Sequence, residues 1–220
     1  MSDHDKDNVI ADRAAEVTLS APTSIGSGYM RYERFELSLP RDGEAALQQK
    51  RDVIRASRVA AVLPVDLARG QIVLLRQFRL PAHLATGRGD MVEIVAGRID
   101  GDESAAAAAA RECFEEIGVT PERLIELFSV LPTPGFTDEY VTFFLGFVDS
   151  SQALTRGGLA GENEDTRPFV VSIDDAVAAL EHGGVANGLF VSALQWLALH
   201  RGRLQDYFER AQGTAGAAGE

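Results

Sequence analysis

Residues 97–119 decide the fold, and they read GRIDGDESAAAAAARECFEEIGV. The alanines at 105–110 favour a helix and let it pack closely on a sheet. Asp102 can cap the start of this helix, and Gly118 suits its C-terminal cap because glycine adopts a left-handed conformation without strain. Gly97, at the other end, allows a close approach of the backbone and an unusual turn. The stretch therefore predicts a loop, a helix that ends just before the second glycine, and another loop.

Three glutamates occupy positions on the expected helix that share one face. Glu112, Glu115 and Glu116 are spaced i, i+3 and i+4, and residues at this spacing are neighbours on a helix surface. Their like charges repel, so the helix needs a cation, which Arg111 or divalent metal ions can supply. Mg²⁺ prefers oxygen ligands and bridges carboxylates to substrate phosphates. Taken alone, the pattern also fits a solvated acidic face, and we expect these carboxylates to point toward the surface.

The spacing of the whole stretch favours the metal interpretation. Five residues separate Gly97 from Glu103, seven more separate Glu103 from Arg111, and the remaining positions follow directly. This arrangement resembles the signature of the Nudix hydrolases, G-x5-E-x7-R-E-U-x-E-E-x-G-U, in which U is a bulky apolar residue. The departure is Cys113 at the first U position, which is tolerable because a buried thiol behaves as a small hydrophobe. The resemblance implies a metal-dependent pyrophosphohydrolase with a Nudix α/β/α sandwich, a mixed β-sheet and an N-terminal β arm.

The resemblance also implies roles for the residues of the signature. The groups that it places on the metal ions are Glu112, Glu116 and the backbone carbonyl of Ala96. Glu115 contributes to the same acidic site and is a candidate catalytic residue. An ion pair between Glu103 and Arg111 would fix the loop to the helix. The implied cofactor is Mg²⁺, with Mn²⁺ as the alternative.

Two features beyond the signature narrow the branch of the family. Pro134 lies 15 residues after Val119, and a proline there resembles the mark of the ADP-ribose pyrophosphatase branch. The loop 161–167 reads GENEDTR and resembles the loop of bacterial ADP-ribose pyrophosphatases whose first glutamate activates the attacking water. That role maps onto Glu162, a general base that a mobile loop can bring to the water, while Glu164 would be a further metal ligand. The plainer interpretations are a turn proline and an acidic surface loop.

The resemblance extends over about residues 28–200 and implies a substrate site. The substrate-binding residues implied in this way are Tyr29, Arg51, Arg79, Pro134 and Glu139. The two arginines match side chains that hold the substrate, and the tyrosine matches an aromatic ring that stacks on adenine. A surface arginine and a core tyrosine are the plainer alternatives. The resemblance further implies a homodimer with an exchanged N-terminal arm, which would carry the tyrosine to the partner's site.

The rest of the chain alternates between strand and helix patterns. The expected strands are 29–39, 53–65, 71–78, 91–95, 124–131, 140–148 and 169–171. Two further helices are expected at 173–181 and 189–200, with loops at 81–90 and 149–168. Because strands and helices interleave and hairpin signals are present, we expect an α/β sandwich with a mixed sheet rather than a doubly wound parallel sheet.

Length and composition set the broad class. The chain has 220 residues, of which 45% are hydrophobic, and a formal net charge of −12. This acidity argues against a nucleic-acid-binding protein, which normally carries a basic face. The N-terminus lacks a signal-peptide pattern, and no apolar run approaches the roughly 20 residues of a membrane span. The single cysteine excludes an intrachain disulfide. We expect a cytoplasmic protein that contacts neither nucleic acid nor membrane.

These expectations combine into a domain plan and a function. Residues 1–57 would form an N-terminal arm that dimerises, 58–212 the Nudix hydrolase domain, and 213–220 a flexible tail. The expected reaction is metal-dependent hydrolysis of the nucleotide sugar ADP-ribose to AMP and ribose 5-phosphate. The alternatives are another nucleoside diphosphate sugar, such as GDP-mannose or UDP-glucose, and a non-catalytic ADP-ribose sensor. The sensor is disfavoured because the signature carboxylates are intact and no basic helical extension is present.

Overall fold

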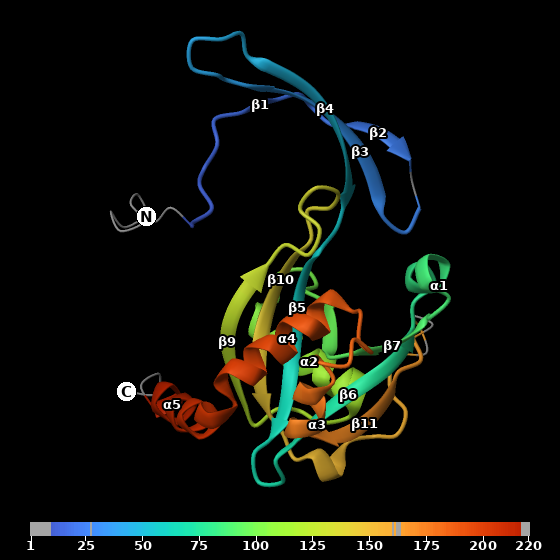
Figure 1. Cartoon of the computed structure of the whole chain (residues 1–220), viewed down its shortest axis with the longest axis vertical. Helices are drawn as coiled ribbons and strands as arrows, with labels where there is room; N and C mark the ends of the chain where they lie inside the picture. Colours follow the sequence, from blue (N-terminus) through green and yellow to red (C-terminus); the bar gives the residue numbers. More distant parts are fainter. Residues whose placement is uncertain (1–9, 27, 160, 162–163, 217–220) are drawn as a thin grey trace. The chain divides into compact units, whose positions relative to one another are not determined.

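A computed structural model gives the fold of residues 10–26, 28–159, 161 and 164–216, with side chains described up to Ala211. The chain forms two compact units (Figure 1). The first contains the residues up to Ala56 together with Gly135–Asp138, and the second contains Ser57–Pro134 and the residues from Glu139 onward. We describe each unit by itself.

The first unit is a small antiparallel sheet. Its strands are β1 (Thr18–Leu19), β2 (Thr23–Gly26), β3 (Arg31–Leu39) and β4 (Leu47–Arg55). Strand β3 pairs with β4 along one edge and with β1 and β2, one after the other, along the opposite edge. The expected strand at 29–39 is confirmed as β3. The unit corresponds to the N-terminal β arm that the resemblance implied.

A single strand over 53–65 is wrong, because the chain pauses between β4 and β5 (Arg58–Asp66). The carboxylate of Asp138 explains the break. Its Oδ1 accepts the backbone N–H of Ala56 at 2.6 Å, and its Oδ2 accepts Nε of Arg55 at 2.5 Å. A side chain therefore takes the hydrogen bond that a continuing strand partner would have made.

The second unit is built on a mixed sheet of seven strands. Its other strands are β6 (Gln71–Phe78), β7 (Asp90–Glu93), β8 (Val95–Arg98), β9 (Arg123–Val130), β10 (Tyr140–Phe147) and β11 (Arg167–Ser172). The main order is β11-β6-β5-β10-β9, with β7 beside β6 and β8 beside β5. Strands β5 and β10 are parallel, and the other pairs are antiparallel. The expected mixed sheet is confirmed.

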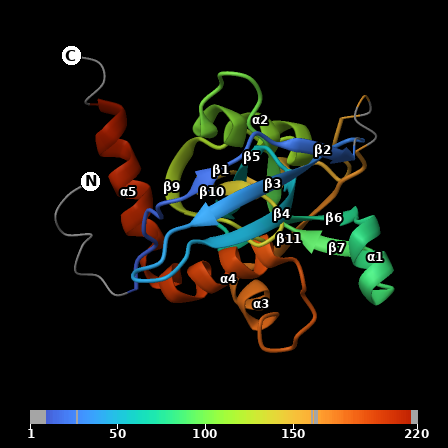
Figure 2. The ribbon, with the colours of Figure 1, turned by 90° about the horizontal axis from the view of Figure 1, so that it is seen from above.

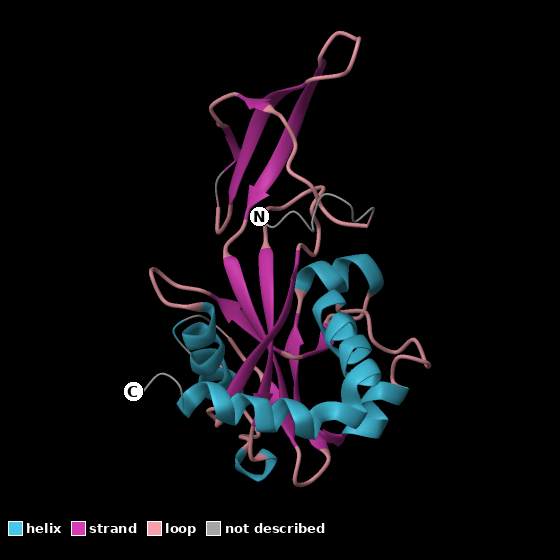
Figure 3. Cartoon of the chain, turned by 90° about the vertical axis from the view of Figure 1, so that its left-hand side faces the viewer, coloured by secondary structure: helices cyan, strands magenta, loops and turns pink. Residues whose placement is uncertain are grey.

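Helices cover both faces of this sheet (Figures 2 and 3). Helix α2 (Ala105–Ile117) packs on one face, and α3 (Ile173–Ala178) and α4 (Gly188–His200) pack on the other. Alternation along β5 supplies both cores, since Ala60 and Val62 face α2 while Ala61 and Leu63 face α4. Burying one such large apolar side chain stabilises the fold by about 1.5–3 kcal/mol. The observed architecture is the expected α/β/α sandwich.

Helix α2 begins later than the sequence predicts. Its N-cap is Ser104, whose Oγ accepts the backbone N–H of Ala107 at 3.1 Å, so the expected cap at Asp102 is wrong. Both residues are good N-caps, and the structure selects the one whose side chain reaches the first turn. The predicted C-terminal end is confirmed, since Gly118 adopts φ 75° and its N–H bonds to the carbonyl of Phe114.

Three other segments differ from expectation. The expected loop 81–90 contains helix α1 (Leu80–Thr86), which has a proline in its first turn, where a missing N–H costs nothing. The expected strand 91–95 is two strands, because β7 pairs with β6 and β8 pairs with β5. Helix α5 (Leu204–Gly216) reaches into the segment expected as a tail. No helix in the described part of the chain is long and apolar enough to cross a membrane.

Candidate active site

The carboxylates of Glu112 and Glu116 lie inside the second unit rather than on its surface. Their exposed fractions are 8% and 2%, so the expectation of surface-facing carboxylates is wrong for both. Burial raises the pKa of Glu112, and the charges of Glu115 and Glu164 add to the rise against the opposing effect of Arg111. Burial also raises the pKa of Glu116 well above its usual range. Two buried acidic groups side by side favour a bound cation that would keep both ionised.

Gly97 makes room for one of these carboxylates. It lies in β8, paired with Ala60, and a Cβ built on it would stand 1.9 Å from Cδ of Glu112. Any side chain at this position would therefore displace the carboxylate. The expected close approach at Gly97 is confirmed. The expected unusual turn is wrong, because Gly97 lies within strand β8 and is not one of the glycines with a positive φ. The neighbouring residue also helps, since the N–H of Ala96 donates to Oε2 of Glu116 at 3.1 Å.

The side chain of Arg111 forms hydrogen bonds with several other residues of the Nudix signature. Its guanidinium donates to carboxylate oxygens of Glu103 at 2.7 Å, Glu112 at 2.7 Å and Glu115 at 3.0 Å, and to the carbonyl of Arg98 at 2.8 Å. The bonds to Glu103 come first among the contacts that raise the pKa of Arg111. The expected role of the Glu103–Arg111 pair in fixing the loop to the helix is confirmed. All the described acceptors around this guanidinium belong to the protein itself.

The polar loop after β10 is fastened to the last turn of α2. The N–H of Gly158 donates to the carbonyl of Glu115 at 2.9 Å, and the buried Thr166 hydroxyl donates to the carbonyl of Glu116 at 3.0 Å. These bonds satisfy carbonyls that a helix end leaves without partners. Glu164 belongs to this attached loop. It lies close enough to the buried carboxylates for its charge to raise the pKa of both Glu112 and Glu116. The predicted base, Glu162, lies outside the described residues.

A second guanidinium lies beside the acidic group. Arg79 directly follows β6 and is the N-cap residue of α1. Its guanidinium donates to Glu93, the last residue of β7, through Nε at 3.0 and 3.2 Å and Nη2 at 2.7 Å. Burial lowers the pKa of Arg79, but the bonds to Glu93 and the charges of Glu93, Glu116 and Glu164 outweigh it, so the pKa is raised. Nδ2 of Asn187 donates to the same carboxylate at 3.0 Å. Arg79 is thus close to the predicted metal ligands.

The donor set of this acidic group fits a hard divalent cation. It offers carboxylate and carbonyl oxygens, which Mg²⁺ prefers, and one of its two buried carboxylates, that of Glu112, fills the space that Gly97 leaves open. Within residues 10–26, 28–159, 161 and 164–216, no group of three His, Cys, Asp or Glu side chains is arranged to hold a metal ion. The set of Ala96, Glu112, Glu116 and Glu164 therefore stays a prediction.

The predicted substrate residues divide between the two units. Tyr29 is 83% exposed and Arg51 is exposed on β4, and both belong to the first unit. The core-tyrosine alternative for Tyr29 is wrong. Pro134 and Glu139 belong to the second unit; Pro134 is exposed, and burial raises the pKa of Glu139. Their contacts with substrate stay predictions.

The sequence reasoning gave no role to Glu93, Asn187 or Thr166. The sequence contains a signal for Glu93, because a carboxylate in the otherwise apolar stretch 91–95 needs a hydrogen-bond or ion-pair partner if it is buried. No local pattern marks Asn187 as more than a helix cap, or Thr166 as a buried hydroxyl. Their partners lie 94 and 50 residues away in the chain.

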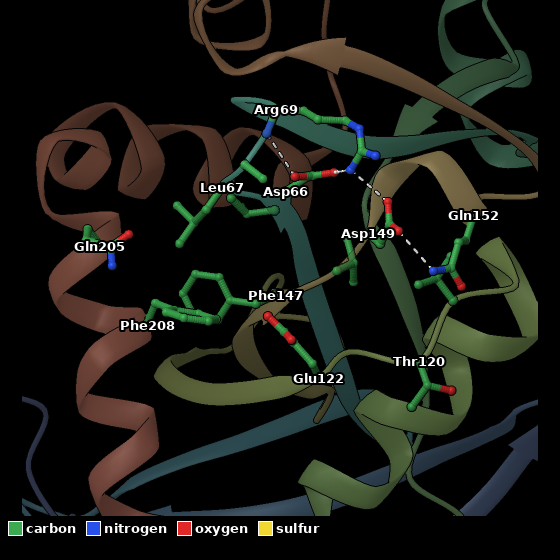
Figure 4. Close-up of a pocket in the computed structure, with 14 residues that line it drawn as sticks. Asp66, Leu67, Arg69, Thr120, Glu122, Phe147, Asp149, Gln152, Gln205 and Phe208 are labelled. Atoms are coloured by element: carbon green, nitrogen blue, oxygen red, sulfur yellow. Dashed lines mark hydrogen bonds and ion pairs between the residues drawn. The ribbon is translucent and has the colours of Figure 1, made fainter.

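The second unit also contains a separate cavity, and Figure 4 shows the residues that line it. It has a volume of about 620 Å³ and opens where β5 and β10 end, beside Phe147 and Phe208. Val65, which lines the cavity, lies five residues further along β5 than Ala60, the residue paired with Gly97. At the usual rise of a strand, Val65 and Ala60 are roughly 16 Å apart. Two of the three acidic residues that line it, Asp66 and Asp149, form ion pairs with Arg69 at 2.9 and 2.8 Å, and the third is Glu122. This cavity shares no lining residue with the carboxylate site.

Comparison with known proteins gives a consistent result. The chain matches the NUDIX domain family over residues 56–190. It is 36% identical over 165 residues to the ADP-ribose pyrophosphatase of Escherichia coli (strain K12), covering 75% of this chain and 79% of the relative. The ADP-ribose pyrophosphatase of Haemophilus influenzae is 34% identical over 164 residues, covering 73% and 76%. The GDP-mannose pyrophosphatase of Yersinia pestis is 27% identical over 177 residues, covering 80% and 88%.

A solved structure described as an ADP compounds hydrolase resembles this chain with a TM-score of 0.65. The superposition covers 86% of this chain and 97% of that chain at 17% identity. At that identity the likeness concerns the fold.

Proposed function

This chain belongs to the Nudix family, and from that premise we propose that it hydrolyses the pyrophosphate of ADP-ribose to AMP and ribose 5-phosphate. One observation carries the proposal. The carboxylates of Glu112 and Glu116 are both buried, that of Glu112 against Gly97 and that of Glu116 against the N–H of Ala96, in a chain 36% identical to a protein named ADP-ribose pyrophosphatase. The chain is a pyrophosphohydrolase, and ADP-ribose is the substrate that its relatives favour.

In this proposal the protein supplies a site for divalent cations and a base. Glu112, Glu116, Glu164 and the carbonyl of Ala96 hold Mg²⁺, with Mn²⁺ as the alternative. When bound, the cation neutralises phosphate charge and lowers the pKa of water. Arg111 keeps Glu112 and Glu115 in place through the bonds described above. Glu115 is the alternative general base to Glu162.

The reaction is a displacement at phosphorus. Glu162 takes a proton from water, the water oxygen bonds to one phosphorus, and the bond from that phosphorus to the bridging oxygen breaks. The bridging oxygen leaves with the other phosphate, so the two products are phosphomonoesters. No covalent intermediate on the enzyme is required.

Residues from each of the two units contact the substrate in this proposal. Tyr29 stacks on adenine, and Arg51 and Arg79 hold the anionic part, with Pro134 and Glu139 at the rim. The protein is a homodimer whose residues 1–57 form an exchanged arm, with 58–212 as the catalytic domain and 213–220 as a tail. The 83% exposure of Tyr29 supports this role, because its ring is accessible to a ligand. The protein acts in the cytoplasm on a small molecule and binds no nucleic acid.

GDP-mannose is the second candidate substrate, since a GDP-mannose pyrophosphatase is 27% identical over 80% of this chain. The test is a panel of ADP-ribose, GDP-mannose and UDP-glucose with Mg²⁺ or Mn²⁺, followed by chromatography of the products. We expect the highest kcat/KM for ADP-ribose, with AMP and ribose 5-phosphate formed in equal amounts. A higher kcat/KM for GDP-mannose would overturn the substrate assignment, and full turnover in excess EDTA would overturn the metal requirement.

A further inference from the structure

Arg79 differs from the other guanidinium beside the acidic group in how much of it the protein uses. Arg111 donates to three carboxylates and one carbonyl. Arg79 donates from Nε and Nη2 to Glu93 alone, and its side chain is 43% exposed. In the described part of the chain no hydrogen bond engages its Nη1. The outer edge of Arg79 can therefore receive an anionic ligand, whereas Arg111 is already engaged.

The inner edge of Arg79 is held by a carboxylate that is itself fixed. Glu93 is only 4% exposed, and a bidentate pair of this kind sets the plane of the guanidinium as well as its position. A buried carboxylate must have its remaining lone pairs satisfied. Asn187 does this, because its Nδ2 donates to Oε1 of Glu93 at 3.0 Å.

Asn187 is fixed in turn by the start of α4. Its Oδ1 accepts the backbone N–H of Phe190 at 3.1 Å and caps the helix. The amide thus donates at one end and accepts at the other, and flipping it would place donor against donor and acceptor against acceptor. A chain of hydrogen bonds therefore runs from the first turn of α4 through Glu93 to Arg79.

We propose that Glu93 and Asn187 are positioning residues that hold the guanidinium of Arg79 against the diphosphate of the substrate. The proposal rests on the proposed function, because the diphosphate is the anion that this guanidinium would meet. Neither residue touches substrate, so both act through Arg79. Their loss should weaken substrate binding more than it slows the chemical step.

The experiment separates the cap made by Asn187 from its bond to Glu93. Asn187→Ser keeps a good N-cap but removes the Nδ2 donor. Asn187→Asp also keeps the cap and sets a second carboxylate against Glu93. Ser172→Ala is the matched control: Ser172 caps α3 by accepting the N–H of Asp175 at 3.0 Å, and it has no contact with Glu93 among the described residues.

The readouts are the thermal midpoint, kcat, KM, and the Kd of a methylene-bridged, non-hydrolysable analogue of the substrate. Asn187→Ser should raise KM and Kd about tenfold, as loss of a supporting hydrogen bond behind a ligand-binding group typically does. Its kcat and midpoint should change little, and Asn187→Asp should raise KM and Kd further. Ser172→Ala should lower the midpoint and leave KM and Kd unchanged. Asn187→Ser that lowers the midpoint without changing Kd would overturn the proposal.

A double-mutant cycle identifies Arg79 as the intermediary. In an Arg79→Ala background, Glu93→Gln and Asn187→Ser should each have no further effect on Kd, since residues that act through one group are not additive. Additive losses would show that they act elsewhere and would overturn the proposal. The cycle uses whichever of ADP-ribose and GDP-mannose the wild type hydrolyses with higher kcat/KM, and the corresponding analogue. A wrong substrate assignment therefore changes the probe and leaves this test intact.

Discussion

In the first unit one carboxylate, that of Glu33, is buried beside Arg55 and others meet their cations at the surface, whereas the second unit buries several of its carboxylates. Arg34 pairs with Asp52 at 2.6 Å, and Lys50 with Glu36 at 2.6 Å, on an open ladder. In the second unit Glu116 is 2% exposed and receives a backbone N–H rather than a cation. The two units also differ in their cores, since every buried apolar side chain in the described part of the chain lies at Val59 or beyond.

The difference indicates where each unit obtains its stability. Exposed pairs contribute little, because water and salt screen them, so the first unit has no strong internal source of stability. The second unit has two apolar cores, and these can support the cost of burying carboxylates. Buried acidic groups at a cleft are typical of functional sites. The comparison thus predicts chemistry in the second unit and ligand or partner contacts in the first.

The largest effect should come from removing a buried carboxylate of the second unit. Glu116→Gln keeps the size of the side chain and its capacity to accept the N–H of Ala96, but it loses the charge that would hold a cation. We expect kcat to fall roughly 10²–10³-fold, the loss typical of one group that stabilises charge in the transition state. The thermal midpoint should stay the same or rise, because burial opposes the charged form.

Glu126→Gln is the matched control for this change. Glu126 lies in the same unit on β9 but is exposed, so kcat and midpoint should both be unchanged. Comparable losses of kcat in the two variants would contradict the assignment of Glu116.

The contrast between the units shows what the sequence could reveal. The spacing of the signature predicted the helix, its end at Gly118 and the ion pair of Glu103 with Arg111. It did not predict that Glu112 and Glu116 would be buried, because helical spacing gives a shared face and does not say what covers it. The loop that packs against the end of α2 reaches it through Thr166, 50 residues later in the chain.

Strand boundaries failed for a related reason. The break after Arg55 depends on Asp138, which lies 83 residues further along. The split between β7 and β8 depends on which neighbour each half pairs with. The strand propensity of the local sequence predicts neither the break after Arg55 nor the split between β7 and β8. Likewise, both Asp102 and Ser104 are good caps, and only the packed helix selects between them.

A second test compares one aspartate from each unit. Asp66 is 2% exposed and accepts the N–H and Oγ of Ser150 at 2.9 and 2.7 Å and Nη1 of Arg69 at 2.9 Å. Asp66→Ala removes these three bonds and leaves the buried N–H of Ser150 without its acceptor, whereas Arg69 keeps its bond to Asp149 and the Ser150 hydroxyl keeps its bond to Gln71. We therefore expect a loss of about 2–4 kcal/mol in the free energy of unfolding. Asp52→Ala in the first unit should leave the unfolding midpoint within error. Urea titration measures the free energy of unfolding of both variants. Equal losses in Asp66→Ala and Asp52→Ala would contradict the distinction between the units.

A third test removes the part of the first unit that precedes Ser57. A chain that begins at Ser57 should still fold, because both apolar cores belong to the second unit. Its KM should rise roughly tenfold, since stacking of one aromatic ring on a base contributes about 1–3 kcal/mol and Tyr29 is lost. Tyr29→Ala in the full chain should reproduce much of that rise. Light scattering should show loss of the proposed dimer, and an active dimer with unchanged KM would contradict the role of the arm.

The smallest effect concerns acid. Hydrogen bonds from Ser151 and Gln152, with the charge of Arg69, lower the pKa of Asp149 in the second unit to about 2. A lowered pKa means that the unfolded chain binds this proton first, so the stability that Asp149 contributes is complete above the unfolded value, near pH 4, and is lost as the pH falls through about 2. Asp149→Asn should therefore flatten the decline of stability across that interval, and above pH 5 it should lower the stability by a constant amount without changing its pH dependence.

Trp196, the single tryptophan of the chain, lies in α4 and reports on the second unit by its fluorescence. Asp52 provides the comparison, because Arg34 lowers its pKa in the first unit. If the units unfold separately, Asp52→Asn should leave the acid transition of Trp196 in place while Asp149→Asn changes its steepness. An equal change from both variants would mean that the exposed ladder and the buried core respond to acid as one cooperative structure.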